Sequence, residues 1–472
     1  MGFVLSTLYF VINYLTPPVV FGPLEEVRIE LIIAGLLFLV SLPALSGSIV
    51  LKTPQSVAVL GLAFAGSFSV LFGRGWVGGA VDALPAFFPC ALAYFLVCLH
   101  CNSKKRLQVI VLMLLFVCLF VIAHGYFDLL HGVPQGGVDE AGGVESAGAA
   151  RWNVQHPYLL EMQNDQGEMF YRVRGLGSIN DPNDFGQLIV CVIPLVFIFW
   201  RPRRMGRNMV FVIAPVCVLL FGIFLTHSRG ALLALTALTA VAARRRIGTL
   251  PALLIAGGVF AAAMALHFTG GREISANSGS DRTALWGEGL QMLKAHPFFG
   301  VGLGSVSEFT DSHLTLHNSV VVCAAEIGLV GLYFWCLFLF PTVRNVLVVA
   351  SLAKKSEKEI SEAEPISSAE PLFPRVKGKV EEIDKEEVRR MGSLVFSSLT
   401  GFLVAGWFLS RSYVLTFFLL GGIAEVVFQM ALDRGMVAPR LRLARLLSYT
   451  GGLELSLVLL MYIMLRTANL MH

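Results

Sequence analysis

The chain has 472 residues, of which 56% are hydrophobic and only 14% are charged, and its mean hydropathy is +0.72. Soluble domains usually carry about 25% charged residues, so this composition excludes a string of soluble domains and predicts a membrane protein. The formal net charge is only +4, and we expect no nucleic-acid partner.

Apolar segments that are long enough to cross a bilayer as helices recur almost from end to end. Hydropathy predicts about twelve to thirteen spans and therefore an all-α polytopic membrane protein. Residues 1–21 lack a basic start and a small-residue cleavage site, so we interpret them as a span and not as a signal peptide. The predicted spans are 3–21, 29–47, 55–73, 79–99, 106–124, 184–200, 209–226, 230–243, 248–268, 319–341, 394–410, 413–431 and 446–465.

The eight cysteines all lie in or beside these apolar segments, which argues against a disulfide framework. Cys98 and Cys101 have the spacing of a redox or metal pair. No second pair accompanies them, so we interpret them as ordinary helix cysteines.

Four basic clusters orient the chain, because Lys and Arg are retained on the cytoplasmic side. With the predicted spans all four fall on one side, and two long loops, 125–183 and 269–318, then face outward. The clusters are Lys104–Arg106, Arg201–Arg207, Arg244–Arg246 and Arg434–Arg445.

The alternation of predicted spans and loops divides the chain into five consecutive parts. The most distinctive part is the linker 342–392, because residues 351–392 are rich in Lys and Glu and are typical of a disordered cytoplasmic linker. The parts are an N-terminal transmembrane bundle (1–124), a first outward loop (125–183), a core (184–341) that includes the outward loop 269–318, the linker (342–392) and C-terminal transmembrane helices (393–472).

Arg229 lies in the short turn Thr226-His227-Ser228-Arg229-Gly230 between two apolar helices. An unpaired arginine near the hydrocarbon costs on the order of 2–3 kcal/mol. Snorkelling to the interface is the structural alternative. We favour a residue that faces a polar cavity or an anion.

The second outward loop is predicted to contain a helix over 282–296, capped by Ser280 and Asp281 and ended by Pro297. Its apolar stripe fits a helix that lies on the membrane face or roofs a cavity. The stripe consists of Leu285, Trp286, Leu290 and Leu293.

Glycine-rich residues 300–304 follow this helix. They lack the preceding strand of a dinucleotide-binding loop, but their N–H groups could bind a phosphate. His313 and His317, four residues apart, would share one face of a helix, which raises zinc as an alternative. No HExxH pattern or third ligand accompanies them, so no metal is predicted.

Several motifs in this order resemble the O-antigen ligase and Wzy-type polymerase superfamily. They run from about 174 to 332 and are specific in combination, although each is weak alone. They are Gly177-Ser-Ile-Asn-Asp-Pro-Asn-Asp184, Ser228-Arg-Gly-Ala231, Arg282-x-x-x-Trp286, His296-Pro-Phe-Phe-Gly-Val-Gly-Leu-Gly304, His317-Asn318 and Glu326-Ile-Gly-Leu-Val-Gly-Leu332.

The resemblance implies a GT-C-like helical fold in the bacterial inner membrane, with a site that faces the periplasm and needs no metal or other cofactor. It also implies transfer of a glycan from undecaprenyl pyrophosphate to an acceptor hydroxyl. The implied partners are the bilayer, the lipid-linked glycan donor, and either lipid A-core or another glycan as the acceptor.

By motif, His317 corresponds to the catalytic base, and Arg229 and Arg282 to the pyrophosphate-binding residues. Imidazole titrates near neutral pH and guanidinium binds phosphate oxygens through two bonds, so elementary chemistry favours the same roles. The residues predicted to contact substrate are Arg174, Asp181, Asn318 and Gly302. For Arg174 and Asp181, anchoring of their loop stays an equal alternative, and Asn318 could instead orient the His317 ring.

Three alternatives stay open. A ligase, a repeat-unit polymerase and a protein O-oligosaccharyltransferase share these motifs. A lipid-linked oligosaccharide transporter would place its polar groups near the bilayer midplane, whereas the charges here gather in the outward loops. In a non-catalytic assembly subunit, His317 and both arginines would be structural.

Overall fold

The computed structural model describes residues 1–20, 28–46, 48, 50–131, 156–163, 167, 169–265, 268, 276–352 and 384–470. Most of the predicted linker, residues 353–383, and much of the first outward loop lie outside this set.

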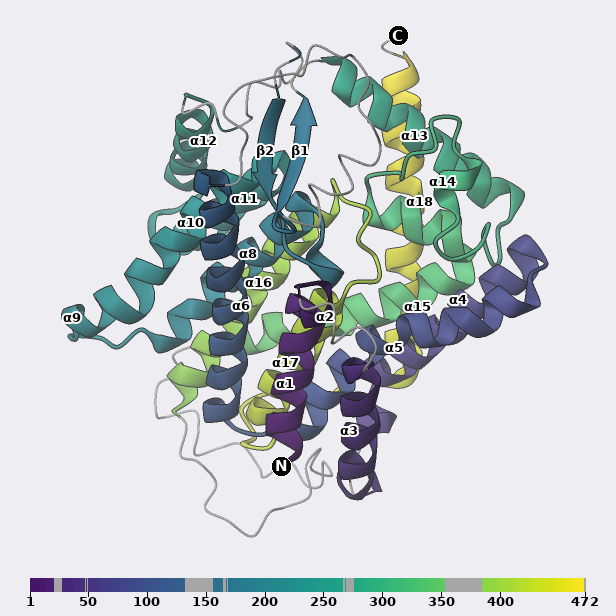
Figure 1. The fold of residues 1–472 in the computed structure, drawn as a ribbon. Helices are drawn as coiled ribbons and strands as arrows, with labels where there is room; N and C mark the ends of the chain where they lie inside the picture. The colour runs from purple at the N-terminus through teal and green to yellow at the C-terminus, as the bar shows by residue number, and fades with distance from the viewer. Residues whose placement is uncertain are drawn as a thin grey trace.

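The described part is a bundle of helices with one short β-hairpin (Figure 1). The prediction of an all-α polytopic membrane protein is confirmed. The helices are α1 (Gly2–Leu15), α2 (Pro17–Val20), α3 (Ile29–Ser46), α4 (Pro54–Arg74), α5 (Val77–His100), α6 (Lys104–His131), α8 (Pro182–Val196), α9 (Met205–Asn208), α10 (Ala214–Thr226), α11 (Arg229–Ile247), α12 (Thr249–Ala265), α13 (Ala276–Ala295), α14 (Val306–Phe309), α15 (Ser319–Ala350), α16 (Lys385–Gly406), α17 (Leu415–Leu432) and α18 (Leu443–Leu470).

Each predicted span coincides with a helix. Among the described residues, eight helical segments have the length and hydropathy of a membrane span, and α1, α3 and α12 are shorter apolar helices. The eight segments are 54–74, 77–100, 104–131, 182–199, 205–226, 319–350, 415–432 and 443–467.

Three predicted boundaries are wrong. The first span breaks at Thr16, whose φ is 41°, because Pro17 and Pro18 follow it. Helix α15 continues to Ala350 through residues assigned to the linker, and α16 already begins at Lys385. Both continuations stay helical because their inward-facing side chains, such as Val346 and Val388, are buried.

The hairpin of β1 (Leu159–Gln163) and β2 (Met169–Val173) is a further addition to the predicted fold. Arg172 fixes it to the bundle: its guanidinium donates to the Thr226 carbonyl at 2.7 Å and to the Asn183 carboxamide at 3.0 Å. The hairpin therefore holds the ends of α8 and α10 together.

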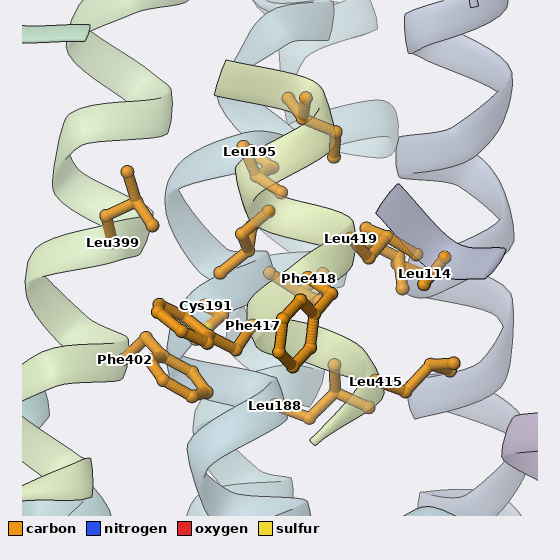
Figure 2. Packing of buried hydrophobic residues seen from close by; sticks show 14 of the residues in the cluster. Leu114, Leu188, Cys191, Leu195, Leu399, Phe402, Leu415, Phe417, Phe418 and Leu419 are labelled. Atoms are coloured by element: carbon orange, nitrogen blue, oxygen red, sulfur yellow. The ribbon is translucent and has the colours of Figure 1, made fainter. Parts of the chain in front are cut away.

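Helix α17 lies at the centre of the core. Figure 2 shows its residues Leu415, Phe417, Phe418 and Leu419 among side chains from three other helices. Those are Leu114 of α6, Leu188, Cys191 and Leu195 of α8, and Leu399 and Phe402 of α16. Phe402 stacks on Phe417 with a centroid separation of 5.1 Å.

The two ends of the bundle differ in the segments that they gather. Lys104 pairs with Glu387, and Arg106 lies 5.3 Å from the centroid of Phe3, so the starts of α1, α6 and α16 share one end. The hairpin, α13 and α14 lie toward the opposite end, as does the C-terminus (Figure 1). This grouping fits the predicted separation of basic clusters from outward loops.

Helix α15 is broken at Gly328, whose φ of 65° and ψ of −168° are not helical. The segment 297–302 runs along this break and bonds to it at four points. The Val301 and Gly302 N–H groups donate to the carbonyls of residues 325 and 326 at 2.9 and 3.0 Å. In the other direction, the N–H groups of residues 329 and 330 donate to the carbonyls of residues 297 and 298 at 2.8 and 3.2 Å. A broken helix at membrane depth needs such partners, because lipid offers none.

Only glycine fits at the two closest points of this contact. A Cβ at Gly300 would overlap the backbone of Ala325 and Glu326, and a Cβ at Gly328 would overlap the backbone of Phe298. Both glycines also have positive φ. The two glycine motifs, far apart in sequence, therefore form one structural unit.

Candidate functional site

Arg229 is the first residue of α11. The turn before it is fixed by Ser228, whose hydroxyl accepts the Ala231 N–H at 3.3 Å, and by His227, whose Nδ1 lies 2.7 Å from the Phe268 carbonyl. The Arg229 side chain is half-buried at this helix start.

Arg282 projects from α13, which packs on α15 through its predicted apolar stripe. Leu285, Trp286 and Leu293 are buried, and the Trp286 indole donates to the Leu316 carbonyl at 2.9 Å. The predicted cap is wrong, because α13 begins at Ala276 and residues 280 and 281 lie inside it.

Arg229 and Arg282 lie close enough for their charges to interact. Burial lowers the pKa of Arg282 from its ordinary value, and the neighbouring Arg229 cation lowers it further. Arg282 also lies 5.9 Å from the ring centroid of Phe408. Two half-buried guanidinium groups in one place repel each other, and a bound anion would relieve that repulsion.

His317 comes directly before Asn318, the capping residue of α15, and has a φ of 49°. Its N–H donates to the Ser410 hydroxyl at 2.8 Å. The ring is half-buried. Burial lowers the pKa of His317 from 6.5, the Arg282 and Arg411 cations lower it further, and Asp181 acts in the opposite direction.

Asn318 has a structural role in the fold. Its carboxamide oxygen accepts the N–H groups of residues 320 and 321 at 2.9 and 3.1 Å, and its amide donates to the Trp407 carbonyl at 3.0 Å. Asn318 thus caps α15 and joins it to the end of α16, whereas the sequence suggested a substrate contact.

The backbone N–H groups of residues 300–303 are not open to a phosphate. Those of Gly300, Val301 and Gly302 donate to backbone carbonyls, and that of Leu303 donates to the Ser69 hydroxyl. Gly302 also packs against the Arg74 side chain. The suggestion of a phosphate cradle at Gly302 has no support in this geometry.

Arg174 and Asp181 belong to the segment before α8. The Asp181 carboxylate caps α8 by accepting the Asn183 N–H at 2.7 Å. Arg174 donates from Nε to the Pro157 carbonyl at 3.1 Å, and burial lowers its pKa while Asp181 raises it. Both residues therefore anchor the segment, and Asp181 also acts on His317.

An ion pair between Arg411 and Asp184 was not predicted. The guanidinium binds the carboxylate through both Nε and Nη2, and Asp184 is buried. Arg411 follows Ser410 in the loop that holds His317. Two signals were present in the sequence: a carboxylate at the start of an apolar span, and an arginine in a short outward turn.

His313 does not share a helix face with His317, because residues 311–318 are not helical. His313 is exposed, and its Nδ1 lies 3.2 Å from the Ser307 carbonyl. The premise of the two-histidine zinc alternative is therefore wrong.

The site thus brings together side chains from four separate segments: Arg229, Arg282, His317 and Arg411, with Asp181 nearby. Charged groups of this kind, arranged around a half-buried imidazole, suit acid–base chemistry on an anionic substrate.

Comparison with known proteins matches residues 214–336 to the family described as O-antigen ligase. The matched segment contains Arg229, Arg282 and His317, while Asp181 and Arg411 lie outside it. No curated protein matches the chain. The match over residues 214–336 supports the resemblance of the chain to the O-antigen ligase and Wzy-type polymerase superfamily.

Proposed function

We propose that the protein transfers a glycan from undecaprenyl pyrophosphate to an acceptor hydroxyl at the periplasmic face of the bacterial inner membrane. The observation that carries the proposal is the convergence of Arg229, Arg282 and His317 within a segment of the O-antigen ligase family.

In the proposed reaction, His317 takes the proton of the acceptor hydroxyl as its oxygen attacks the anomeric carbon of the donor sugar. The bond between that carbon and the pyrophosphate oxygen breaks, and undecaprenyl pyrophosphate leaves with the bonding electrons. The lowered pKa of His317 favours the neutral imidazole that a base requires.

Arg229 and Arg282 bind the pyrophosphate in this proposal. The leaving group gains negative charge as the bond breaks, so two fixed guanidinium groups stabilise the transition state more than the ground state. Because the two guanidinium groups supply the positive charge at the leaving group, we propose that the transfer is metal-independent. The GT-C type is what the family resemblance implies.

The surface glycan of a deletion strain tests the proposal and identifies the acceptor. Free polymer beside bare lipid A-core indicates a ligase, which is the outcome we expect. Glycan of a single repeat indicates a polymerase, and an unglycosylated surface protein indicates a protein transferase. A strain whose surface glycans are all unchanged would contradict the proposal.

A further inference from the structure

A cavity of about 320 Å³ lies beside the loop that holds His317. Gly304 and Thr315, which are exposed, line it toward the outward-loop surface. Glu326, which is buried, lines its inner part. The cavity is therefore open to the side of the molecule on which the outward loops lie, and it leads to a buried carboxylate.

Two residues connect the cavity with His317. Ser410 lines it and accepts the His317 N–H at 2.8 Å. Arg411 lines it and is one of the cations that act on the His317 ring. A molecule in the cavity would thus lie next to the segment that positions the proposed base.

The cavity contains two ionisable side chains, the Glu326 carboxyl and the Arg411 guanidinium. Arg411 binds Asp184 through Nε and Nη2. A carboxylate accepts about four hydrogen bonds and a guanidinium donates about five, so both retain capacity for a ligand. Phe87 and Val322 add apolar walls.

This combination suits a neutral sugar better than a pyrophosphate. Sugar hydroxyls both donate and accept, and so can bind the carboxylate and the guanidinium together, while the C–H faces of the ring pack on apolar walls. A pyrophosphate, by contrast, would find the Arg411 cation of the cavity already paired with Asp184.

We propose that this cavity binds the terminal sugar of the acceptor, with hydroxyls on Glu326 and Arg411. The inference rests on the proposed function, since it assigns the acceptor side of the same site. In the proposed function the donor pyrophosphate binds Arg229 and Arg282, and the His317 ring interacts both with Arg282 and with Arg411 of the cavity.

Binding of a soluble glycan tests the assignment. The probe is the oligosaccharide released by mild acid from the surface glycolipid of the host strain, and saturation-transfer NMR measures its binding to the full chain in nanodiscs. Glu326→Gln replaces one carboxyl oxygen by an NH2 group and so mismatches the hydrogen bonds to the sugar, which is expected to reduce affinity about tenfold or more. Asp311→Asn, an exposed acid in the same outward segment, is the matched control and should bind like the wild type.

Thr315→Trp provides a second variant if Glu326→Gln fails to fold. Thr315 is exposed, so the larger ring fills the mouth of the cavity without removing a buried contact. Loss of glycan binding in this variant supports the assignment. Binding that is equal to wild type in the folded variants, no binding by the wild type, or displacement of the glycan by undecaprenyl pyrophosphate overturns it.

Titration of the same nanodiscs with undecaprenyl pyrophosphate separates this inference from the proposed function. Binding that depends on Arg282, together with a failed glycan experiment, leaves the proposed function intact and removes only the acceptor cavity. If undecaprenyl pyrophosphate fails to bind, or binds Arg282→Ala equally well, the proposed function itself fails.

Discussion

The residues around His317 are positioned by backbone contacts before any substrate arrives. The Ser410 hydroxyl holds the His317 N–H, and Asn318 fixes the start of α15 directly after it. A base that is fixed in this way loses little entropy when the acceptor binds. The residues that position the proposed base, Ser410 and Asn318, are therefore different from the residues with proposed chemical roles.

Substitution of the arginines should distinguish phosphate binding from a structural role. Arg229→Ala and Arg282→Ala should each reduce transfer by about 10²–10³ while the protein stays folded, because each removes a charged donor to the leaving group. Lysine at either position should restore only part of the activity, since a point charge lacks the bidentate geometry. Activity of purified variants, with size-exclusion profiles as the folding control, measures this.

Full activity of Arg282→Lys would refute the bidentate interaction. Aggregation of the alanine variants would mark the arginines as structural. Arg203→Ala, an exposed arginine near the other end of the bundle, is the matched control and should transfer normally.

The pH dependence of transfer should follow His317. Because burial, Arg282 and Arg411 lower its pKa below 6.5, the imidazole is protonated and inactive only at more acidic pH. The donor kcat/KM, which reports the free enzyme, should rise with pH, reach half of its plateau below pH 6.5 and stay level through neutrality. Arg411→Gln removes one cation and should move the midpoint upward. A wild-type midpoint above 6.5 would contradict this role.

At the residue scale, the sequence predicted which side chains lie together in the site, but it did not predict the hydrogen bonds and ion pairs that these segments form. Arg229, Arg282 and His317 lie close together. The sequence pointed to them because a polar residue in an apolar setting costs free energy unless it has a function. Asn318 and Gly302 have their polar groups bound within the protein. The pair of Arg411 and Asp184 was missed, because contact between residues 227 positions apart leaves no local pattern.

At the scale of elements, the unit formed by segment 297–302 and the break in α15 brings the end of α13 against α15. Its four backbone hydrogen bonds replace those that the broken helix lacks. The sequence showed both glycine motifs but not their pairing, and so the first motif suggested a phosphate loop.

Alanine at either close glycine should disrupt this unit. Gly328→Ala combines a positive φ with overlap on the backbone of residue 298, and strain of this kind costs on the order of 1–3 kcal/mol or more. We expect a lower thermal midpoint and lost transfer. Gly257→Ala is the control, because a Cβ at that position in α12 meets no atom of the described residues within 4 Å and alanine favours helix. Equal thermal midpoints for the two variants would contradict the pairing.

The positions of the helices were largely predictable, because the length of an apolar segment is a strong signal of a membrane span. The outward segments were less predictable. The cap of α13, the helix expected for His313 and His317, and the hairpin all depend on tertiary contacts such as those of Trp286 and Arg172.

At the scale of the whole molecule, the orientation in the membrane follows from the basic clusters and stays a prediction. Arg74 of α4 binds Glu308 and Ser305 of the second outward loop, which places two predicted outward segments together. The first basic cluster lies beside the start of α16 at the other end.

Cysteine labelling on intact cells tests this orientation. Seven of the eight native thiols are buried and only Cys217 is exposed, so Cys217→Ala gives a suitable background. An impermeant maleimide should label Thr315→Cys but not Met205→Cys, both at exposed positions. Labelling of residue 205 without residue 315 would reverse the orientation and place the site in the cytoplasm.

The most direct test of the central claim measures glycan transfer by the purified full chain in nanodiscs, with extracted lipid-linked donor, acceptor glycolipid and excess chelator. We predict that the wild type and His313→Ala remain active in chelator. His317→Ala should lose about 10²–10⁴ in rate, the usual effect of removing a general base, while it still binds donor. Near-normal turnover by His317→Ala, or wild-type activity that chelator abolishes and zinc restores, would contradict a metal-independent transfer with His317 as the base.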